Sequence, residues 1–177
     1  MKTLLLITLL LFPSIAFSQT VSELFMKIPF DVLPAGPESR EKMITETKGD
    51  LLKFRLSGAR RGEVKIFAQK DGESLFGMAV DDCNSSDVQF WKFKNGKSKL
   101  VTNEVIKPIT AKDIPAILKV SPTTISSLNQ TLGIVYFYNF HSDSTDIELI
   151  ARKPDSCDVA GKVYDYKFNG KKFSIQK

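Results

Sequence analysis

The stretch Leu52-Lys53-Phe54-Arg55-Leu56 alternates apolar and charged residues. A period of two is typical of a strand that has one face in the protein core and the other in water. Ser57-Gly58 ends the stretch, because both residue types favour turns. From Leu51 onward the sequence therefore predicts half-buried β-strands.

Further strand patterns follow, separated by short turns. Two turns contain Asn-Gly, the dipeptide that favours a two-residue hairpin, at Asn95-Gly96 and Asn169-Gly170. The other expected strands are Glu63 to Ala68, Leu75 to Val80, Val88 to Phe93, Lys99 to Thr102, Gly133 to Phe140, Asp146 to Ala151, Lys162 to Phe168 and Lys171 to Ile175.

The two Asn-Gly turns predict the register of the strands that they join. A two-residue turn at Asn95-Gly96 places Trp91 opposite Leu100 and pairs Lys92 with Lys99, a mildly unfavourable contact of like charges.

A two-residue turn at Asn169-Gly170 places Tyr166 opposite Phe173 and Phe168 opposite Lys171. In this hairpin one face is aromatic and the other is mainly charged, so we expect one face on the core and one in water.

Short helical patterns precede the strands. The first runs from Ser22 to Lys27 and stops before Pro29, and the second, from Glu38 to Ile44, follows a proline suited to a first helical turn. Weaker patterns begin at Thr110 and Pro122. The sequence thus predicts an α+β protein, an antiparallel meander of eight or nine strands with short helices on one face.

The N-terminus has the three parts of an export signal. Lys2 supplies a positive charge, Leu4 to Leu11 is apolar, and Ala16-Phe17-Ser18 offers small residues for cleavage before Gln19. The apolar run is about half of the ~20 residues that span a bilayer. We therefore expect residues 1–18 to be a cleaved signal peptide and the protein to be secreted or periplasmic. No cysteine adjoins the cleavage site, which argues against a lipoprotein, and no later segment predicts a membrane span.

The two halves of the mature chain echo each other. Cys83 precedes Asn95 by 12 residues, and Cys157 precedes Asn169 by 12. The sequence predicts a first α+β repeat over 19–105 and a second over 106–177, sharing one core, each a helix-plus-four-strand unit. The alternative is a coincidence between two hairpins, since the last aromatic residue stands at different distances from the two asparagines.

Cys83 and Cys157 are the only cysteines of the chain. Export leads to an oxidising compartment, so an even count favours a disulfide between them. Two buried thiols are the alternative. With the lone His141 they offer too few ligands for a metal site.

Composition and motifs exclude several classes of function. The 25 basic and 20 acidic residues are interspersed, which gives no electrostatic footprint for nucleic acid. The chain lacks a glycine-rich phosphate loop, Cys-x-x-Cys and Gly-x-Ser-x-Gly. We therefore nominate no catalytic, cofactor-binding or metal-binding residue, and expect no cofactor. Two polar loops are candidates for interaction, and their residues are Asp81, Asp82, Asn84, His141 and Asp143.

Two resemblances accompany these patterns. The segments Leu24 to Pro29, Leu33-Pro34 and Arg40 to Ile44 resemble the opening of an uncharacterised family of small exported proteins from gut-type Gram-negative bacteria, and Cys83 to Trp91 is similar to a later segment of that family. That family has no assigned activity, so the resemblance implies no functional residue. The expected layout is also loosely similar to the secreted β-lactamase-inhibitor protein fold, and a fold alone does not imply function.

These observations favour an exported, non-enzymatic binding or interaction module with a protein or cell-envelope partner. One alternative is a protein inhibitor of a secreted hydrolase, a lysozyme or a protease, which would present a rigid projecting loop. A second is a small hydrolase with paired carboxylates, which would place two acids about 5–10 Å apart in a pocket.

Expression of the full sequence in a Gram-negative host tests the export signal and the disulfide together. We expect mass spectrometry of the periplasmic fraction to find a chain that begins at Gln19 and lacks the two hydrogens of the reduced thiols. A chain that retains Met1, or two free thiols at Cys83 and Cys157, would contradict the respective expectation.

Overall fold

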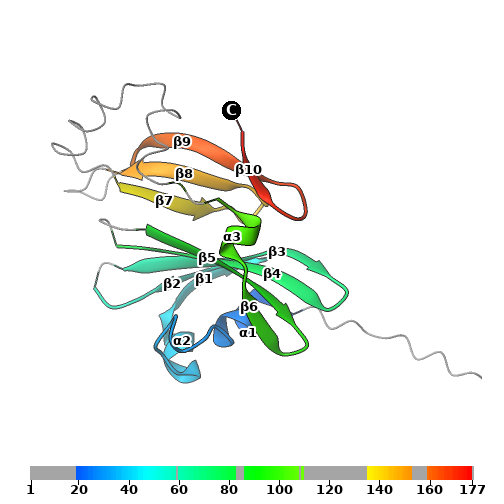
Figure 1. Cartoon of the computed structure of the whole chain (residues 1–177). Helices are drawn as coiled ribbons and strands as arrows, with labels where there is room; N and C mark the ends of the chain where they lie inside the picture. The colour runs from blue at the N-terminus through cyan, green and yellow to red at the C-terminus, as the bar shows by residue number, and fades with distance from the viewer. Residues whose placement is uncertain are drawn as a thin grey trace, which may run out of the picture.

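The computed structural model describes residues 19–58, 60–82, 86–107, 109, 135–152 and 159–176. These residues form two antiparallel sheets and three short helices (Figure 1). The expected signal peptide, the predicted Cys83–Cys157 disulfide, Asn84 and the helical patterns after Thr110 lie outside the described residues.

Both sheets are meanders in which neighbouring strands follow each other along the chain. The first sheet has the order β1 (Ile44–Lys48), β2 (Leu51–Arg55), β3 (Arg61–Lys70), β4 (Glu73–Asp81), β5 (Ser86–Lys94) and β6 (Lys97–Leu100). The second has the order β10 (Phe173–Ile175), β9 (Val159–Phe168), β8 (Ile147–Arg152) and β7 (Val135–Phe140). The predicted α+β fold with an antiparallel meander is confirmed.

The structure has one strand more than the sequence predicts, and that strand is β1. Its residues are half-buried at Ile44 and exposed from Thr45 to Lys48, so they show no apolar alternation. The strand forms because its backbone pairs with β2 at the edge of the sheet. Polar edge strands of this kind carry no periodic signal.

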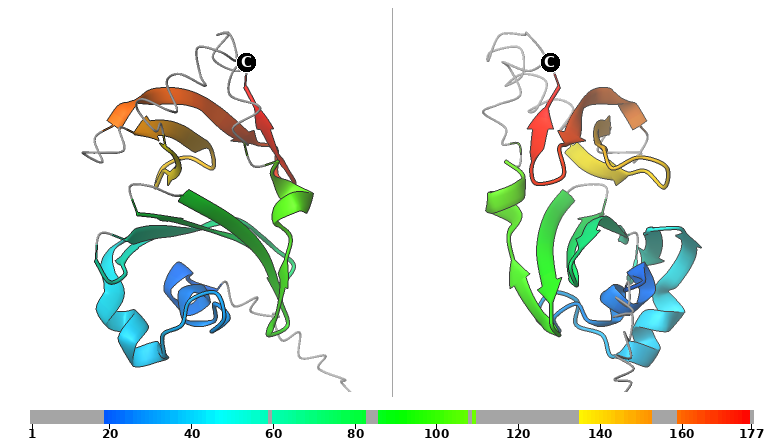
Figure 2. Two further views of the ribbon diagram at one scale, coloured as in Figure 1. Left: turned by 60° about the vertical axis from the view of Figure 1, so that its left-hand side comes forward. Right: turned by 90° about the vertical axis from the view of Figure 1, so that its right-hand side faces the viewer.

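Three layers stack in the molecule. Helices α1 (Val21–Met26) and α2 (Pro37–Met43) lie against one face of the first sheet, and the second sheet covers the other face (Figure 2). The short α3 (Thr102–Val105) follows β6. Helix α1 begins earlier than predicted, because Thr20, and not Ser22, is its N-cap and forms a capping box with Glu23.

A buried arginine holds the two N-terminal helices together. The guanidinium of Arg40, 3% exposed, donates to the carbonyls of Phe25 and Met26 at the end of α1, at 3.2 and 2.9 Å. It also donates to the Leu33 carbonyl at 2.8 Å. These carbonyls lie at and beyond the end of α1, where a cation also complements the helix dipole.

The core between the sheets is aromatic and centres on Phe67. The register of β3 against β4 shifts between Ile66 and Ala68, and Phe67 is the extra residue of this bulge. Ile66 packs on the helix side, whereas Phe67 packs on the second sheet. Its ring lies 5.1 to 6.1 Å from the rings of four phenylalanines, which are Phe90, Phe140, Phe168 and Phe173.

The first hairpin has the predicted register. Trp91 pairs with Leu100 and Lys92 with Lys99 around a turn in which Asn95 and Gly96 have positive φ angles of 50° and 75°. The like charges are relieved because each lysine has its own acid. Lys92 lies 3.1 Å from a carboxylate oxygen of Glu73, and Lys99 lies 2.7 Å from one of Glu104.

The predicted register of the second hairpin is wrong by two residues. Phe173 pairs with Phe168, and the loop contains four residues, 169–172. The side chain of Asn169 accepts hydrogen bonds from the backbone N–H groups of Lys171 and Lys172, which stabilises the longer loop. Because the error is an even number of residues, the predicted aromatic face still packs on the core.

The boundary expected after residue 105 falls directly after α3. The first region contributes six strands rather than four, and β3–β6 and β7–β10 are each a four-stranded meander ending in an Asn-Gly hairpin. Their facing sides form one core. Duplication of a common unit stays a prediction.

Within the described ranges, no helix is long and apolar enough to cross a membrane.

Gly77 provides a test of the intersheet core. A Cβ atom at this position would lie 2.7 Å from ring carbons of both Phe67 and Phe90. We expect Gly77→Ala to lower the free energy of unfolding by about 1–3 kcal/mol, the usual cost of overpacking. Chemical denaturation measures this change.

The matched control is Gly36→Ala, where an added Cβ meets open space and φ is −72°. We expect a smaller loss in this variant, arising from the N-cap position alone. Equal losses in the two variants would contradict the packing argument.

Candidate functional site

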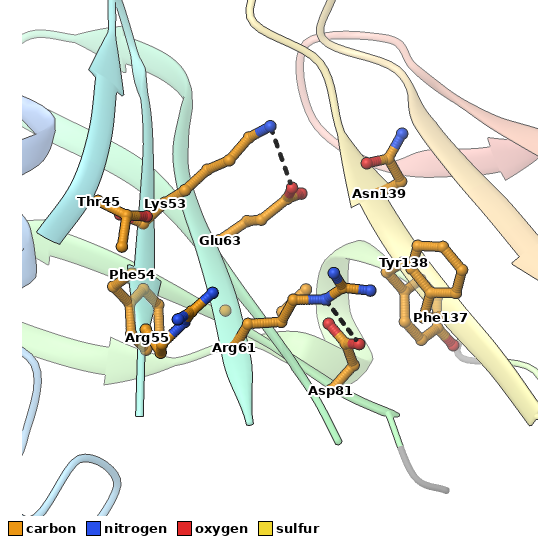
Figure 3. A pocket seen from close by; sticks show the side chains of 12 residues that line it. Thr45, Lys53, Phe54, Arg55, Arg61, Glu63, Asp81, Phe137, Tyr138 and Asn139 are labelled. Atoms are coloured by element: carbon orange, nitrogen blue, oxygen red, sulfur yellow. Dashed lines mark hydrogen bonds and ion pairs between the residues drawn. The ribbon is translucent and has the colours of Figure 1, made fainter. Parts of the chain in front are cut away.

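A charged pocket of about 340 Å³ lies where β7 meets the outer part of the first sheet. The first sheet contributes Lys53, Arg55, Arg61, Glu63 and Asp81, and β7 contributes Phe137, Tyr138 and Asn139 (Figure 3). Pockets for small ligands in proteins begin at about this size.

The alternation of β2 and β3 places these charges on one face. Along β2, Leu52 and Phe54 pack toward the helices, so Lys53 and Arg55 lie on the face that looks toward the second sheet. Farther along that face, apolar residues such as Phe67 form the intersheet core. The second sheet does not cover the whole of this face, and the part of the first sheet that it leaves uncovered lines the pocket.

The pocket is positive overall. Lys53 Nζ lies 3.9 Å from a carboxylate oxygen of Glu63, and Arg61 Nε lies 3.3 Å from one of Asp81 (Figure 3). Arg55 is exposed, and its side chain has neither a hydrogen bond nor an ion pair with the described residues. Three basic side chains therefore face two acids, and one base is available to a ligand.

Glu63 joins the two sheets. Its Oε2 accepts a hydrogen bond of 2.8 Å from the backbone N–H of Phe140 in β7. Burial raises the pKa of Glu63 above its usual range, although the Phe140 N–H and the charge of Lys53 act in the opposite direction.

The structure places the first predicted loop beside the pocket. Asp81, the last residue of β4, lines it and pairs with Arg61. Asp82 lines a smaller cavity of about 150 Å³ together with Arg60 and Asp87. Only one of the two described aspartates of this loop therefore belongs to the larger pocket.

The second predicted loop is anchored on the first sheet. The buried Lys65 of β3, 3% exposed, donates to the His141 carbonyl at 2.6 Å. Burial lowers the pKa of this lysine, and the charges of Asp50 and the exposed Asp143 act in the opposite direction. The His141 ring lies 3.6 Å from Glu148. Asp146 closes the loop through an ion pair with Lys167.

Glu63 lies between the two predicted loops. The charge of Asp81 raises its pKa and the charge of His141 lowers it, and both act within the short range of such interactions. The loops are 59 residues apart in the chain (Asp82 to His141), and the fold brings their inner ends to one partly buried carboxylate.

Sequence reasoning missed the residues that form the pocket. The alternation at Lys53 and Arg55 was interpreted as a face in water, which is the usual environment of charged strand faces. The available signal was the charge at every second position in two successive strands, since Arg61, Glu63 and Lys65 repeat the pattern on β3. In the described part of the chain, no group of three or more His, Cys, Asp or Glu side chains could hold a metal ion.

Comparisons with known proteins inform on the fold. No family model matches the chain, and no curated protein matches it. The chain is similar to the structure of a domain of an uncharacterized protein from Porphyromonas gingivalis W83, with a TM-score of 0.62 and 11% sequence identity. The match covers 90% of this chain and 99% of that domain. At this identity the likeness shows a shared fold.

The raised pKa of Glu63 predicts a pH dependence of stability. The folded protein holds the proton of Glu63 more tightly than the unfolded chain, in which a glutamate has a pKa of about 4.3. As the pH rises from that value through the folded pKa, burial of the charge increasingly disfavours the folded state. The free energy of unfolding of the wild type, relative to Glu63→Gln, should fall over this window and then level off.

Chemical denaturation at a series of pH values measures this difference. The matched control is Glu46→Gln, which removes an exposed carboxylate that pairs with the same Lys53 at 3.6 Å. A pH dependence of equal size in both variants would contradict the role of burial at Glu63.

Proposed function

We propose that the mature chain is an exported, non-enzymatic binding module and that the charged pocket binds an anionic ligand from the cell envelope or a protein partner. The observation that carries the proposal is Arg55, a basic side chain at a preformed cavity that has no partner among the described residues.

The chemistry of the pocket supports an anionic ligand. A guanidinium presents a planar fork of donors that matches a carboxylate, and charge-assisted hydrogen bonds are the strong ones in proteins. Arg61, the pairing partner of Arg55 on β3, and Lys53, two residues earlier on β2, add positive potential. Asn139 of β7, whose side-chain amide donates to Glu148 at 3.2 Å, lies at the opposite wall.

Two alternatives stay predictions. A hydrolase could use Glu63 and Asp81, which line the same pocket, yet each acid has a cationic partner and this favours a binding role. An inhibitor of a secreted hydrolase could use the loop after His141, which Lys65 and Lys167 anchor.

Titration with a panel of anions tests the proposal. The panel holds oligoglutamate, an acidic oligosaccharide and a sulfated oligosaccharide, and backbone amide shifts are followed by NMR. We expect at least one member to shift amides of β2, β3 and β7, and Arg55→Glu to weaken its binding at least about tenfold, because a repelling charge replaces an attracting one.

The matched control is Lys97→Glu, which changes the net charge equally at an exposed hairpin outside the pocket. We expect it to leave binding within about twofold, as distant surface charges are screened by salt. The proposal fails if no member of the panel binds, or if both variants weaken binding alike.

A further inference from the structure

The wall of the pocket formed by β7 is the edge of the second sheet. The order of that sheet is β10-β9-β8-β7, so in the described part of the chain β7 has a neighbouring strand on one side only. An edge strand presents unpaired backbone N–H and C=O groups to any chain that can pair with them.

The hydrogen bond to Glu63 shows which groups of β7 face the pocket. In an antiparallel ladder, one residue directs both peptide groups to its partner strand and the next directs both away. The Phe140 N–H donates to Glu63 and not to β8. Tyr138 and Tyr136, at alternate positions, therefore direct their N–H and C=O groups to the same free edge.

Tyr138 meets the pocket in this way. Its side chain is buried in the intersheet core, where its ring lies 6.2 Å from that of Tyr166. The same residue also lines the pocket, and by the alternation of β7 its N–H and C=O groups lie on the edge that has no neighbouring strand among the described residues.

The residues of β7 themselves also carry none of the charges or prolines that protect sheet edges from pairing. Natural edges carry charged residues or proline, or are very short. Of the three other edges, β1 carries Glu46 and Lys48, β6 carries Lys97 and Lys99, and β10 spans three residues. Strand β7 reads Val-Tyr-Phe-Tyr-Asn-Phe, without charge or proline.

We propose that the ligand of the pocket is an acidic segment of another protein that binds in extended form, adds to β7 as a fifth strand of the second sheet, and directs acidic side chains to Lys53, Arg55 and Arg61. This inference rests on the proposed function and deepens it. Such strand addition takes affinity from backbone hydrogen bonds and specificity from alternate side chains.

The geometry gives the pattern of the segment. Side chains at every second position of the added strand share one face, so acids at alternate positions would face the first sheet. Lys53 and Arg55 are themselves two residues apart on β2. Pairing ends before Phe140, because Glu63 occupies its N–H group and would repel a further acid.

Charge favours this occupant over a second copy of the chain. Pairing of β7 with β7 of another copy would bring two sets of basic residues, Lys53, Arg55 and Arg61, into one region. The net charge of the chain is +5, which adds to that repulsion.

Short synthetic peptides test the proposal by fluorescence anisotropy. The first alternates glutamate and valine, and the second has the same composition with the glutamates adjacent. The third is the first peptide N-methylated at alternate residues, in two phases: one is methylated at the odd-numbered residues and the other at the even-numbered residues. We expect the alternating peptide to bind best. One of the two N-methylated phases should bind at least about tenfold more weakly, because it cannot donate to β7.

Variants and hydrogen exchange complete the test. Arg55→Glu should weaken binding of the alternating peptide at least about tenfold, whereas Lys97→Glu should change it by less than about twofold. The amides of Tyr136 and Tyr138 should exchange more slowly with the peptide bound, since strand pairing protects them.

The outcomes separate this inference from the proposed function. If both N-methylated peptides bind like the parent, or if only acidic oligosaccharides bind, strand addition is overturned while the anion pocket stands. If no anion of either panel binds, both proposals fall. A dimer that forms through β7 in analytical ultracentrifugation, with no binding of peptide, would overturn the inference in favour of a second copy.

Discussion

The packing of Phe67 between the two sheets is the contact on which the rest of the structure depends. The alternation of β3 places this ring on the face toward the second sheet, where it meets Phe140, Phe168 and Phe173. Rings from β7, β9 and β10 thus converge on one side chain of the first sheet. Large aromatic side chains contribute most to burial in such cores, so this contact decides where the second sheet lies.

Strand β3, which carries Phe67, extends from the intersheet core into the pocket. Along β3, residues Arg61, Glu63 and Lys65 lead up to Phe67 on the face that looks toward the second sheet. Lys65 donates to the His141 carbonyl, and Glu63 accepts from the Phe140 N–H. These bonds satisfy buried charges that would otherwise be costly, and they fix the end of β7 above the first sheet. Arg61, one step farther out, lies in the pocket.

The sequence predicted those strands and turns that depend on local sequence patterns. The alternation from Leu52 to Leu56 and the turn at Asn95-Gly96 follow from strand periodicity and turn chemistry, and both agree with the structure. The loop after Asn169 was predicted too short, because Asn-Gly also fits a four-residue loop when the asparagine side chain caps it. Strand β1 was missed because only its pairing with β2 makes it a strand.

The pocket could not be predicted in this way, because it depends on two contacts, each of which joins residues far apart in the chain. The alternation of Lys53 and Arg55 gives the same pattern whether the charged face meets open water or a second sheet that stops short of it. Only the position of the second sheet distinguishes the two cases. By aligning β7 with the end of the apolar core, Phe67 and Glu63 together leave, in the described part of the chain, a strand edge without charge or proline beside a basic face. An uncharged edge next to unshared positive charge is unfavourable for an isolated protein and suited to one that takes up an acidic strand.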